Sequence, residues 1–591
     1  MTYTEKLQAI RSQMLESHID AYIIPSSDPH ISEYMPEHYK AIPFVSGFTG
    51  SAGTLVITQD FAGLWTDFRY FEQATEQLEG SGVELVKMQV QAAPEYITWL
   101  TSRLTKGTVV AADERLVSVL LGELLVQMLA AKGIGFADQD FLSPIWENRP
   151  ELPQQKAYLI DPEHTGQTVA AKLAAVRAAL LGQGADQHLV SSLDDLAWLF
   201  NIRGGDVAYN PVVLGFALIS QDHAKLFIAE GKLSDTDKES LLKSGVEVLP
   251  YEEIGDALQN IPEHQTILID PKRNCFAFTK ALPVSVKIIR ATNPSTNLKA
   301  IKNETELANT RKAMLLDGVA VVKFMKWLYE QVGVATVDEL SAAAELHRLR
   351  AEQEGFSGDS FNTISAYAAH GALPHYGPTE ESNVEIKPEG LFLIDSGGQY
   401  LYGTTDITRT LPMGNNTEEE AIDYTLVLKG MIEGCRLRFP KGTYGYQIDA
   451  VTRRPLWEHG LNYGHGTGHG VGYFLNVHEG PQVFNPSPNP VAIEPGMITS
   501  IEPGVYRPGK HGIRIENLVN TVVDISNEFN QFYAFECLTI APISTRIVKK
   551  ELLEEVQVAW LNRYNKMVFD KLSPLLSADE REWLKEETKA I

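Results

Sequence analysis

The chain has 591 residues, too many for one hydrophobic core, so we expect roughly two to four domains. Apolar residues make up 44% and charged residues 21%, the usual balance of a globular protein in water. The formal net charge of −25 disfavours binding to the phosphate backbone of nucleic acids and suits a site that concentrates cations.

Cysteine usage and the N-terminus indicate the compartment. Cys275, Cys435 and Cys537 are far apart and form no CxxC pair, so we expect neither a disulfide framework nor a thiolate zinc site. The first segment, MTYTEKLQAIRSQML, has the pattern of an amphipathic helix without the apolar core of a signal peptide. No apolar run approaches the roughly 20 residues that span a membrane. We therefore expect a cytoplasmic protein that binds neither membranes nor nucleic acid.

Two α/β domains are predicted in the first half of the chain. In residues 1–154, the N-terminal helix is followed by extended runs, AYIIP, TLVIT and GLWTDFRY, and then by another helical segment. The polar, proline-containing stretch 143–155 predicts a linker. Residues 155–295 repeat the order, with a helical TVAAKLAAVRAALL before extended runs such as FALIS and KLFIAE. No close residue-level repeat relates the two segments.

The third domain is predicted at residues 296–591. Asn303 and Glu306 have the spacing of a capping box at a helix start. A buried helical stripe is then predicted by apolar residues at seven-residue intervals, Leu307, Met314, Val321 and Leu328. Ser577 and Glu580 predict a second capped helix near the end of the chain.

The motif LIDSGGQYLYGTTDITRT contains two carboxylates. Asp395 ends a short apolar run before Ser-Gly-Gly turns the chain, and Asp406 lies in a second extended run. A hairpin would place these carboxylates on neighbouring strands. An aspartate before Ser-Gly-Gly is, taken alone, more typical of an ordinary turn.

Three further motifs add one imidazole and two carboxylates. His469 lies in HGTGHGVG, where flanking glycines allow close backbone approach, although a glycine-rich loop explains that pattern equally well. Glu502 ends MITSIE and is followed by Pro-Gly. Glu516 lies in IRIEN and shares one strand face with Arg514, an alternation that a surface ion pair would also produce.

The combination is more specific than its parts. Carboxylate oxygens with one imidazole nitrogen suit manganese, cobalt, iron or zinc. Two such ions held side by side can lower the pKa of a bridging water and polarise a carbonyl. The five residues therefore predict a two-metal hydrolase, with Asp395, Asp406, His469, Glu502 and Glu516 as ligands.

These motifs resemble those of the pita-bread metallopeptidases, and the whole chain resembles the three-domain aminopeptidase P (Xaa-Pro aminopeptidase) family. Matching stretches include DDLAWLFNIRGGDVAYNPV, YGHGTGHGVGYFLNVHEGP, IEPGVY and GIRIEN, with GFTGSAGTL and LWTDFRY near the N-terminus. The resemblance implies a multidomain α/β chain, with two creatinase/prolidase-type N-terminal α/β domains before an α+β pita-bread catalytic domain. It also implies a homodimer.

The resemblance also implies a role for each ligand. Asp395 would bind one metal ion, His469 and Glu502 the other, and Asp406 and Glu516 would bridge both. Two divalent ions per subunit are implied, most often Mn²⁺, with Co²⁺, Zn²⁺ or Fe²⁺ as alternatives. A hydroxide that bridges the metals would attack the peptide bond.

Further catalytic groups are implied around the ligands. His375, His465 and His478 would hold the substrate and stabilise the tetrahedral intermediate. Glu502 would shuttle the proton, and Arg514 would orient the carboxylates. An additional histidine, His370, is expected to have a surface or core role instead of a ligand role, and Pro374 restricts the backbone just before His375.

The predicted activity is that of a metal-dependent aminopeptidase, a hydrolase that releases the residue before proline from peptides with proline second. Prolidase and methionine aminopeptidase are the alternatives within the class, because the five ligands are common to them. The chain length and the two preceding α/β domains favour aminopeptidase P. A non-catalytic pita-bread protein and a metal-free creatinase-like enzyme are disfavoured, because every ligand position holds a competent residue.

Overall fold

The computed structural model describes residues 1–90 and 93–591, and the chain divides into two compact units. The first unit comprises Met1–Asp161 and Gln167–Thr296, and the second comprises Pro162–Gly166 and Asn297–Ile591. Within the described residues, no helix is both long and apolar enough to cross a membrane.

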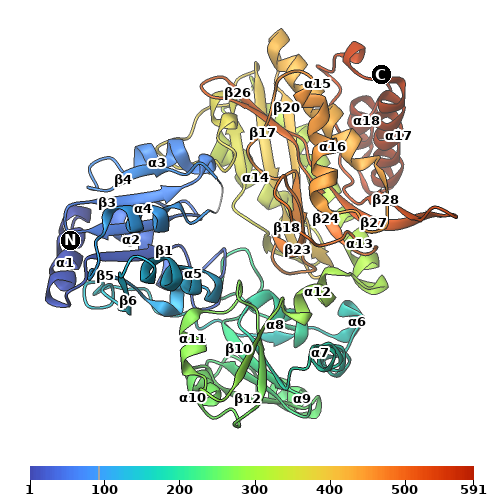
Figure 1. Ribbon diagram of the computed structural model, residues 1–591. Helices are drawn as coiled ribbons and strands as arrows, with labels where there is room; N and C mark the ends of the chain where they lie inside the picture. Colours follow the sequence, from blue (N-terminus) through green and yellow to red (C-terminus); the bar gives the residue numbers. More distant parts are fainter. Residues whose placement is uncertain (91–92) are drawn as a thin grey trace. The chain divides into compact units, whose positions relative to one another are not determined.

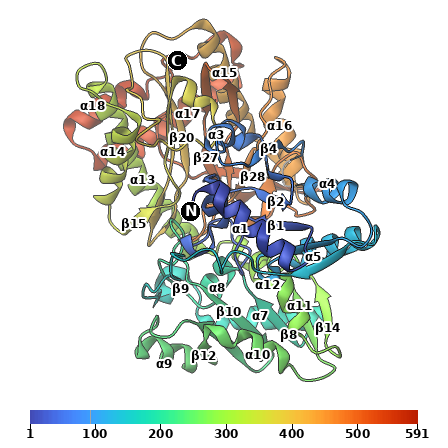
Figure 2. The same ribbon diagram turned by 90° about the vertical axis from the view of Figure 1, so that its left-hand side faces the viewer.

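The first unit begins with a six-stranded sheet of order β4-β3-β2-β1-β5-β6. Helix α1 (Tyr3–Glu16) lies beside this sheet in both views (Figures 1 and 2). Alternate residues of β1 (Ala21–Pro25) face opposite sides, so Tyr22 and Ile24 pack with α1 while Ala21 and Ile23 belong to a second core on the other face. The other strands are β2 (Thr54–Thr58), β3 (Ala62–Thr66), β4 (Glu84–Lys87), β5 (Val109–Ala112) and β6 (Gly135–Asp138). The other helices are α2 (Ala41–Ser46), α3 (Phe71–Gln77), α4 (Glu95–Arg103) and α5 (Val119–Ala130).

A second six-stranded sheet, of order β12-β11-β10-β8-β13-β14, has the same sequence of parallel and antiparallel pairings as the first. Its strands are β8 (Gln187–Val190), β10 (Gly215–Ser220), β11 (Ala224–Ile228), β12 (Val246–Pro250), β13 (Thr266–Ile269) and β14 (Lys287–Arg290). The helices are α7 (Val169–Gln183), α8 (Leu193–Leu199), α9 (Asp235–Lys243), α10 (Ile254–Gln259) and α11 (Phe276–Ala281). A small ladder joins β7 (Tyr158–Leu159) and β9 (Ile202–Arg203). The two predicted α/β segments thus share one topology.

The second unit opens with the long helix α13 (Glu304–Gln331), which the capping box predicted. The Asn303 side chain accepts hydrogen bonds from the backbone N–H groups of Thr305 and Glu306, and the Glu306 carboxylate accepts one from the Asn303 N–H. The predicted stripe, whose apolar residues recur every seven positions from Leu307 to Leu328, is buried. The boundary between the two units falls within helix α12 (Pro294–Ala300). The short helix α6 (Pro162–Thr165), although earlier in the chain, belongs to the second unit.

The second unit contains several antiparallel sheets. Two three-stranded sheets are formed by β15 (Phe356–Asp359), β18 (Gly398–Tyr400) and β19 (Gly403–Thr404), and by β16 (Ile364–Tyr367), β17 (Leu391–Ser396) and β20 (Ile407–Pro412). A six-stranded sheet has the order β21 (Arg438–Pro440), β28 (Gln531–Cys537), β27 (Asn517–Ser526), β24 (Ile498–Ile501), β22 (Gly468–Gly470) and β23 (Glu479–Phe484). Strands β25 (Gly504–Arg507) and β26 (His511–Arg514) form a separate hairpin.

Helices of this unit bury their apolar sides against the sheets. One core joins α13 to α15 (Glu418–Cys435), α16 (Gly445–Trp457) and α17 (Glu555–Leu572), together with β24, β27 and β28. A second core joins α13 and α14 (Glu339–Ala351) to β17 and β20. The C-terminal helix α18 (Ala578–Glu587) begins at the predicted capping box of Ser577 and Glu580. This packing fixes the strands that carry the predicted ligands.

Candidate metal centre

Strands β17 and β20 bring the first two carboxylates together. Asp395 lies in β17 and pairs with Thr408 of β20, and Asp406 directly precedes β20. Both are buried, with 6% and 4% of their surface exposed. The prediction that the two carboxylates lie on neighbouring extended segments is confirmed, although the short strands β18 and β19 intervene in the chain.

His469 is the central residue of β22, between two glycines that the sheet requires. A Cβ on Gly468 would lie 1.8 Å from the carbonyl oxygen of Ser500, and one on Gly470 would lie 2.3 Å from that of Glu479. Neither position has room for a side chain, because β22 is closely flanked by β23 and β24. The glycines around His469 therefore serve close strand packing, which directs the imidazole to a fixed place.

The two glutamates lie at strand ends beside the same histidine. Glu502 directly follows β24, and Glu516 lies between β26 and β27. The hydroxyl of Ser500 donates to Glu502 Oε1 over 3.1 Å, and that of Thr408 donates to Glu516 Oε2 over 2.9 Å. These hydroxyls, on strands β24 and β20 of two different sheets, orient the two carboxylates.

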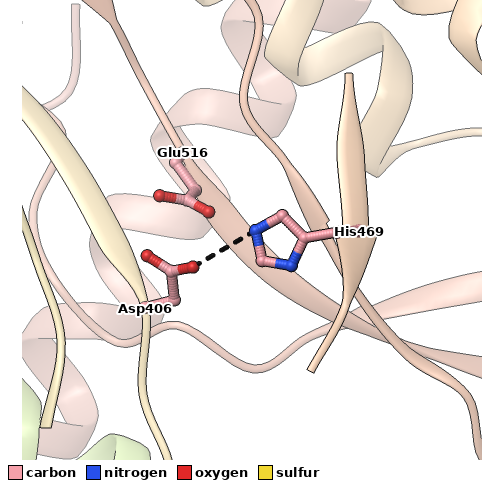
Figure 3. Close-up of side chains that lie close together, drawn as sticks. All are labelled: Asp406, His469 and Glu516. Atoms are coloured by element: carbon pink, nitrogen blue, oxygen red, sulfur yellow. Dashed lines mark ion pairs between the residues drawn. The ribbon is translucent and has the colours of Figure 1, made fainter. Parts of the chain in front are cut away.

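Asp406, His469 and Glu516 converge on one point, as Figure 3 shows. Each offers one ligand atom, and these atoms all lie within 4.8 Å of one another. His469 Nε2 is 3.5 Å from Asp406 Oδ2 and 3.4 Å from Glu502 Oε1. Asp395 is held nearby through its pairing with Thr408. The structure thus brings all five predicted ligands to one region.

The site contains buried carboxylate oxygens that lack hydrogen-bond donors. Asp395 Oδ1 and Glu516 Oε1 are buried with no hydrogen-bond partner among the residues that the structure describes. An unsatisfied buried carboxylate oxygen is unfavourable, and a metal ion would satisfy it. Four carboxylates and one imidazole also match the ligands that hard and borderline divalent cations prefer. The residues present therefore fit divalent metal ions.

Burial and neighbouring negative charges raise the pKa values of two glutamates in this site, and negative charges raise that of the histidine. Burial raises the pKa of Glu502 to about 7, a shift that His469 opposes and Asp406 reinforces. Burial and the charges of Asp406 and Glu502 also hold the pKa of Glu516 well above its usual value. Burial alone would lower the pKa of His469, but the hydrogen bond to Asp406 and the charge of Glu502 outweigh it and raise that pKa to about 9. The metal-free site thus retains protons at neutral pH.

These shifts predict that stabilisation by metal grows with pH. A group with a raised folded-state pKa contributes stability that is present below its unfolded pKa and lost as the pH rises through the folded value. Glu502 loses its contribution as the pH approaches about 7, and His469 as it approaches about 9. Because the metal ions replace these protons, we expect Mn²⁺ to raise the melting temperature more at pH 8 than at pH 5.5. Calorimetry of metal-free and metal-loaded protein checks this, and an equal gain at both pH values would contradict it.

Arg514 and Tyr506 connect the carboxylates to a second histidine. Arg514 donates to Asp395 Oδ2 from Nη2 over 2.6 Å and from Nε over 3.1 Å. Its Nη1 donates to the Tyr506 hydroxyl over 2.7 Å, and that hydroxyl lies 2.7 Å from His465 Nε2. Arg514 thus contacts one of the predicted ligands directly, and its orienting role stays a prediction. The sequence prediction missed Tyr506, although it lies in the motif IEPGVY.

The other predicted histidines have different environments. His478 contacts His469 edge to face, with ring centroids 4.3 Å apart. His375 is half-buried and follows Pro374, whose carbonyl oxygen accepts from Arg514 over 3.3 Å. His370 instead lies 2.9 Å from a Glu339 carboxylate oxygen and stacks on Tyr376. His370 is partly exposed and pairs with the buried Glu339 carboxylate, and the expectation of a surface or core role for it stays a prediction.

Models of known families match nearly the whole chain. Residues 6–140 and 148–306 match two creatinase/prolidase N-terminal domains, residues 308–522 match metallopeptidase family M24, and residues 531–591 match the C-terminal region of that family. The fold class predicted from the sequence, two such α/β domains before a pita-bread catalytic domain, is confirmed.

Relatives match over the full length. A probable Xaa-Pro aminopeptidase P of Sordaria macrospora is 38% identical over 99% of both chains, and the Xaa-Pro aminopeptidase ApepP of Drosophila melanogaster is 39% identical over 100% of this chain and 99% of its own. The chain belongs to the Xaa-Pro aminopeptidases of metallopeptidase family M24. The predicted family and enzyme class, a metallopeptidase and hydrolase, are thereby confirmed.

A solved structure of another Xaa-Pro aminopeptidase has the same fold. The X-prolyl aminopeptidase of Caenorhabditis elegans superposes with a TM-score of 0.95, at 35% identity over 100% of both chains. That protein is described as a cytosolic enzyme with a di-nuclear active site. The similarity extends over the whole chain, both N-terminal domains included. A prolidase from Pyrococcus horikoshii, at 24% identity and a TM-score of 0.50, covers 63% of this chain and 99% of its own, and it shares the fold alone.

Proposed function

We propose that this aminopeptidase cleaves the bond before proline with two divalent metal ions held by Asp395, Asp406, His469, Glu502 and Glu516. The observation that carries the proposal is the convergence of ligand atoms from Asp406, His469 and Glu516 within 4.8 Å. The two buried carboxylate oxygens without donors and the di-nuclear site of the Caenorhabditis elegans enzyme support it. Asp395 serves one ion, His469 and Glu502 the other, and Asp406 and Glu516 both.

The proposed chemistry divides between the ions and the protein. When bound in this ligand set, the two ions would activate a water as the nucleophile and would polarise the scissile carbonyl. Glu502 accepts the proton of that water and passes it to the departing nitrogen. Arg514 keeps the Asp395 carboxylate in a fixed orientation through its two hydrogen bonds.

Three histidines act on the substrate in this proposal. His375, His465 and His478 hold the peptide and stabilise the oxygen of the tetrahedral intermediate. The 2.7 Å contact of Tyr506 with His465 and the packing of His478 on His469 support fixed orientations for these two rings. Such preorganised donors lower the barrier because they need no reorientation during the reaction.

The preference for proline has a physical reason. The bond before proline is a tertiary amide without an N–H, so a protease that binds that hydrogen loses its donor. A site that activates the carbonyl through metal ions avoids this requirement. If the site also selects a free α-amine, two bonds from the scissile carbonyl carbon, the enzyme removes only the first residue of a peptide.

Further features of the enzyme belong to the same proposal. Mn²⁺ is the proposed native metal, since oxygen-rich ligand sets suit it, with Co²⁺, Zn²⁺ and Fe²⁺ as competitors. A cytoplasmic location is proposed, in keeping with the description of the Caenorhabditis elegans relative as cytosolic. A homodimer is proposed as well. Domain boundaries at 154/155 and 295/296 are proposed. The family matches that end at 140 and 306, and the division between the two compact units after Thr296, support them.

A peptide panel tests the proposed function. We expect Mn²⁺-loaded protein to release the first residue from Xaa-Pro-Yaa tripeptides and longer peptides with proline second. Matched Xaa-Ala-Yaa peptides should be cleaved at least about 100-fold more slowly, because pocket selectivity of a few kcal/mol corresponds to that ratio. Released amino acids are quantified by liquid chromatography. Cleavage of Xaa-Pro dipeptides alone would instead identify a prolidase.

A further inference from the structure

Arg409 lies directly behind the candidate metal centre, on the opposite face of β20. In a strand, successive side chains point to opposite faces. Thr408 and Thr410 face the site, since their hydroxyls donate to Glu516 Oε2 and to the carbonyl oxygen of Arg514 over 2.9 Å each. Arg409 therefore faces away from the ligands, and it is 2% exposed.

The Arg409 guanidinium is a buried hub of hydrogen bonds. Nη1 donates to the carbonyl oxygen of Glu516 over 2.6 Å and to that of Thr408 over 3.0 Å. Nη2 donates to Asn517 Oδ1 (2.9 Å), the Ala541 carbonyl oxygen (3.0 Å) and the Tyr564 hydroxyl (3.1 Å), and Nε donates to the Pro542 carbonyl oxygen (2.9 Å). Each of these acceptors is uncharged. A buried arginine normally has a carboxylate partner. The Arg409 cation is held instead by backbone carbonyl oxygens and neutral side chains.

The acceptors on the far side come from the C-terminal region, residues 531–591. Helix α17 fixes this stretch through Asn565, which accepts from the Ile543 N–H over 3.1 Å and donates to the Ile543 carbonyl oxygen over 3.0 Å. The neighbouring Tyr564 hydroxyl lies 3.0 Å from the Ala541 carbonyl oxygen and 3.1 Å from that of Thr539. Helix α17 thus presents the Ala541 and Pro542 carbonyls to Arg409.

We propose that Arg409 and Tyr564 are positioning residues for the metal centre, and that the C-terminal region is its rear wall. Tyr564 and the Ala541–Pro542 carbonyls hold Arg409, and Arg409 holds the main chain of Glu516 and the side chain of Asn517. This proposal rests on the proposed role of Glu516 as a ligand of both ions. A bridging carboxylate must be held within a fraction of an ångström of its working position, and loosening such outer contacts weakens metal affinity.

Metal titration of the full-length protein tests this inference. Mn²⁺ added to metal-free protein is followed by electron paramagnetic resonance of the free ion, which gives the dissociation constant without any substrate. We expect Tyr564→Phe to weaken Mn²⁺ binding about 10-fold and Arg409→Lys about 100-fold, within the range found for outer contacts of metal ligands. Once saturated with Mn²⁺, Tyr564→Phe should show a lower kcat with an unchanged KM, because the substrate contacts remain.

A matched tyrosine separates positioning from general destabilisation. Tyr424 is 1% exposed, and its hydroxyl donates to the Ser544 carbonyl oxygen of the same C-terminal stretch over 2.7 Å. Tyr424→Phe should lower the melting temperature but leave Mn²⁺ affinity unchanged. Wild-type affinity in both Tyr564→Phe and Arg409→Lys, or an equal loss in Tyr424→Phe, would overturn the proposal. Glu516→Gln serves as a reference: if it too binds Mn²⁺ like the wild type, the ligand role of Glu516 has failed instead.

Discussion

Replacement of Glu502 by glutamine is expected to lower kcat on an Xaa-Pro-Yaa peptide by about 10³-fold in Mn²⁺-saturated protein. Glutamine preserves the shape of the side chain and its contact with Ser500. It removes the negative charge 3.4 Å from His469 and the capacity to accept a proton. Steady-state kinetics at saturating Mn²⁺ and substrate measures the effect. The loss should appear mainly in kcat, since the groups proposed to hold the peptide are unchanged.

Glu420→Gln is the matched control for this experiment. Glu420 is 9% exposed and accepts from the Thr417 N–H in the capping box of α15, a position that glutamine also fills. Its kcat should equal that of the wild type. Full activity of metal-replete Glu502→Gln would falsify the proposed proton shuttle and the two-metal mechanism with it.

Asp406→Asn is expected to weaken Mn²⁺ binding by more than about 100-fold. Loss of a residue that merely contacts a ligand costs roughly 10- to 100-fold, and this substitution removes a ligand itself. Peptidase activity should be lost at micromolar Mn²⁺. The same substitution should raise the melting temperature of metal-free protein at pH 10, because above the pKa of about 9 the His469 imidazole is neutral and no longer forms an ion pair with Asp406. Asp406 contributes to the raised pKa of Asp395, Glu502 and Glu516, so its neutralisation relieves repulsion in the empty carboxylate cluster. Mn²⁺ titration and calorimetry measure the two effects.

Asp317→Asn provides the contrasting case. Asp317 is 4% exposed and accepts from Arg350 Nε over 2.8 Å, away from the predicted ligands. Breaking this buried pair should lower stability by about 3–5 kcal/mol and leave Mn²⁺ affinity intact. Opposite changes of melting temperature in the two variants would show that the Asp406 carboxylate is retained for metal binding. A lower metal-free melting temperature in Asp406→Asn would contradict this account.

The fold class could be predicted from the sequence because each segment carries local signals. The capping residues Asn303 and Ser577 predicted helix starts that the structure contains. The common topology of the first two sheets could not be predicted, because pairing between distant strands leaves no residue-level repeat. Strand order is set by long-range packing, whereas capping and periodicity are local.

The proposed ligands could be selected from the sequence because each lies in a short motif punctuated by glycine or proline, or beside a charged residue. The groups that orient them were harder to find. Tyr506, Thr408 and Ser500 contact the site through single hydroxyls, and a hydroxyl in a strand has no distinctive pattern. The link from Arg409 to Tyr564 joins residues far apart in the chain, so only the folded structure reveals it.

Counting metal ions per chain in active protein tests the central claim most directly. Protein loaded with Mn²⁺ and freed of loosely bound metal by gel filtration is analysed by inductively coupled plasma mass spectrometry, alongside its activity on an Xaa-Pro-Yaa peptide. The five-ligand site predicts about two Mn²⁺ ions per chain in fully active protein and fewer in Asp406→Asn. Full activity in protein that holds no divalent metal, or two tightly bound ions in Asp406→Asn, would contradict the assignment of the metal centre.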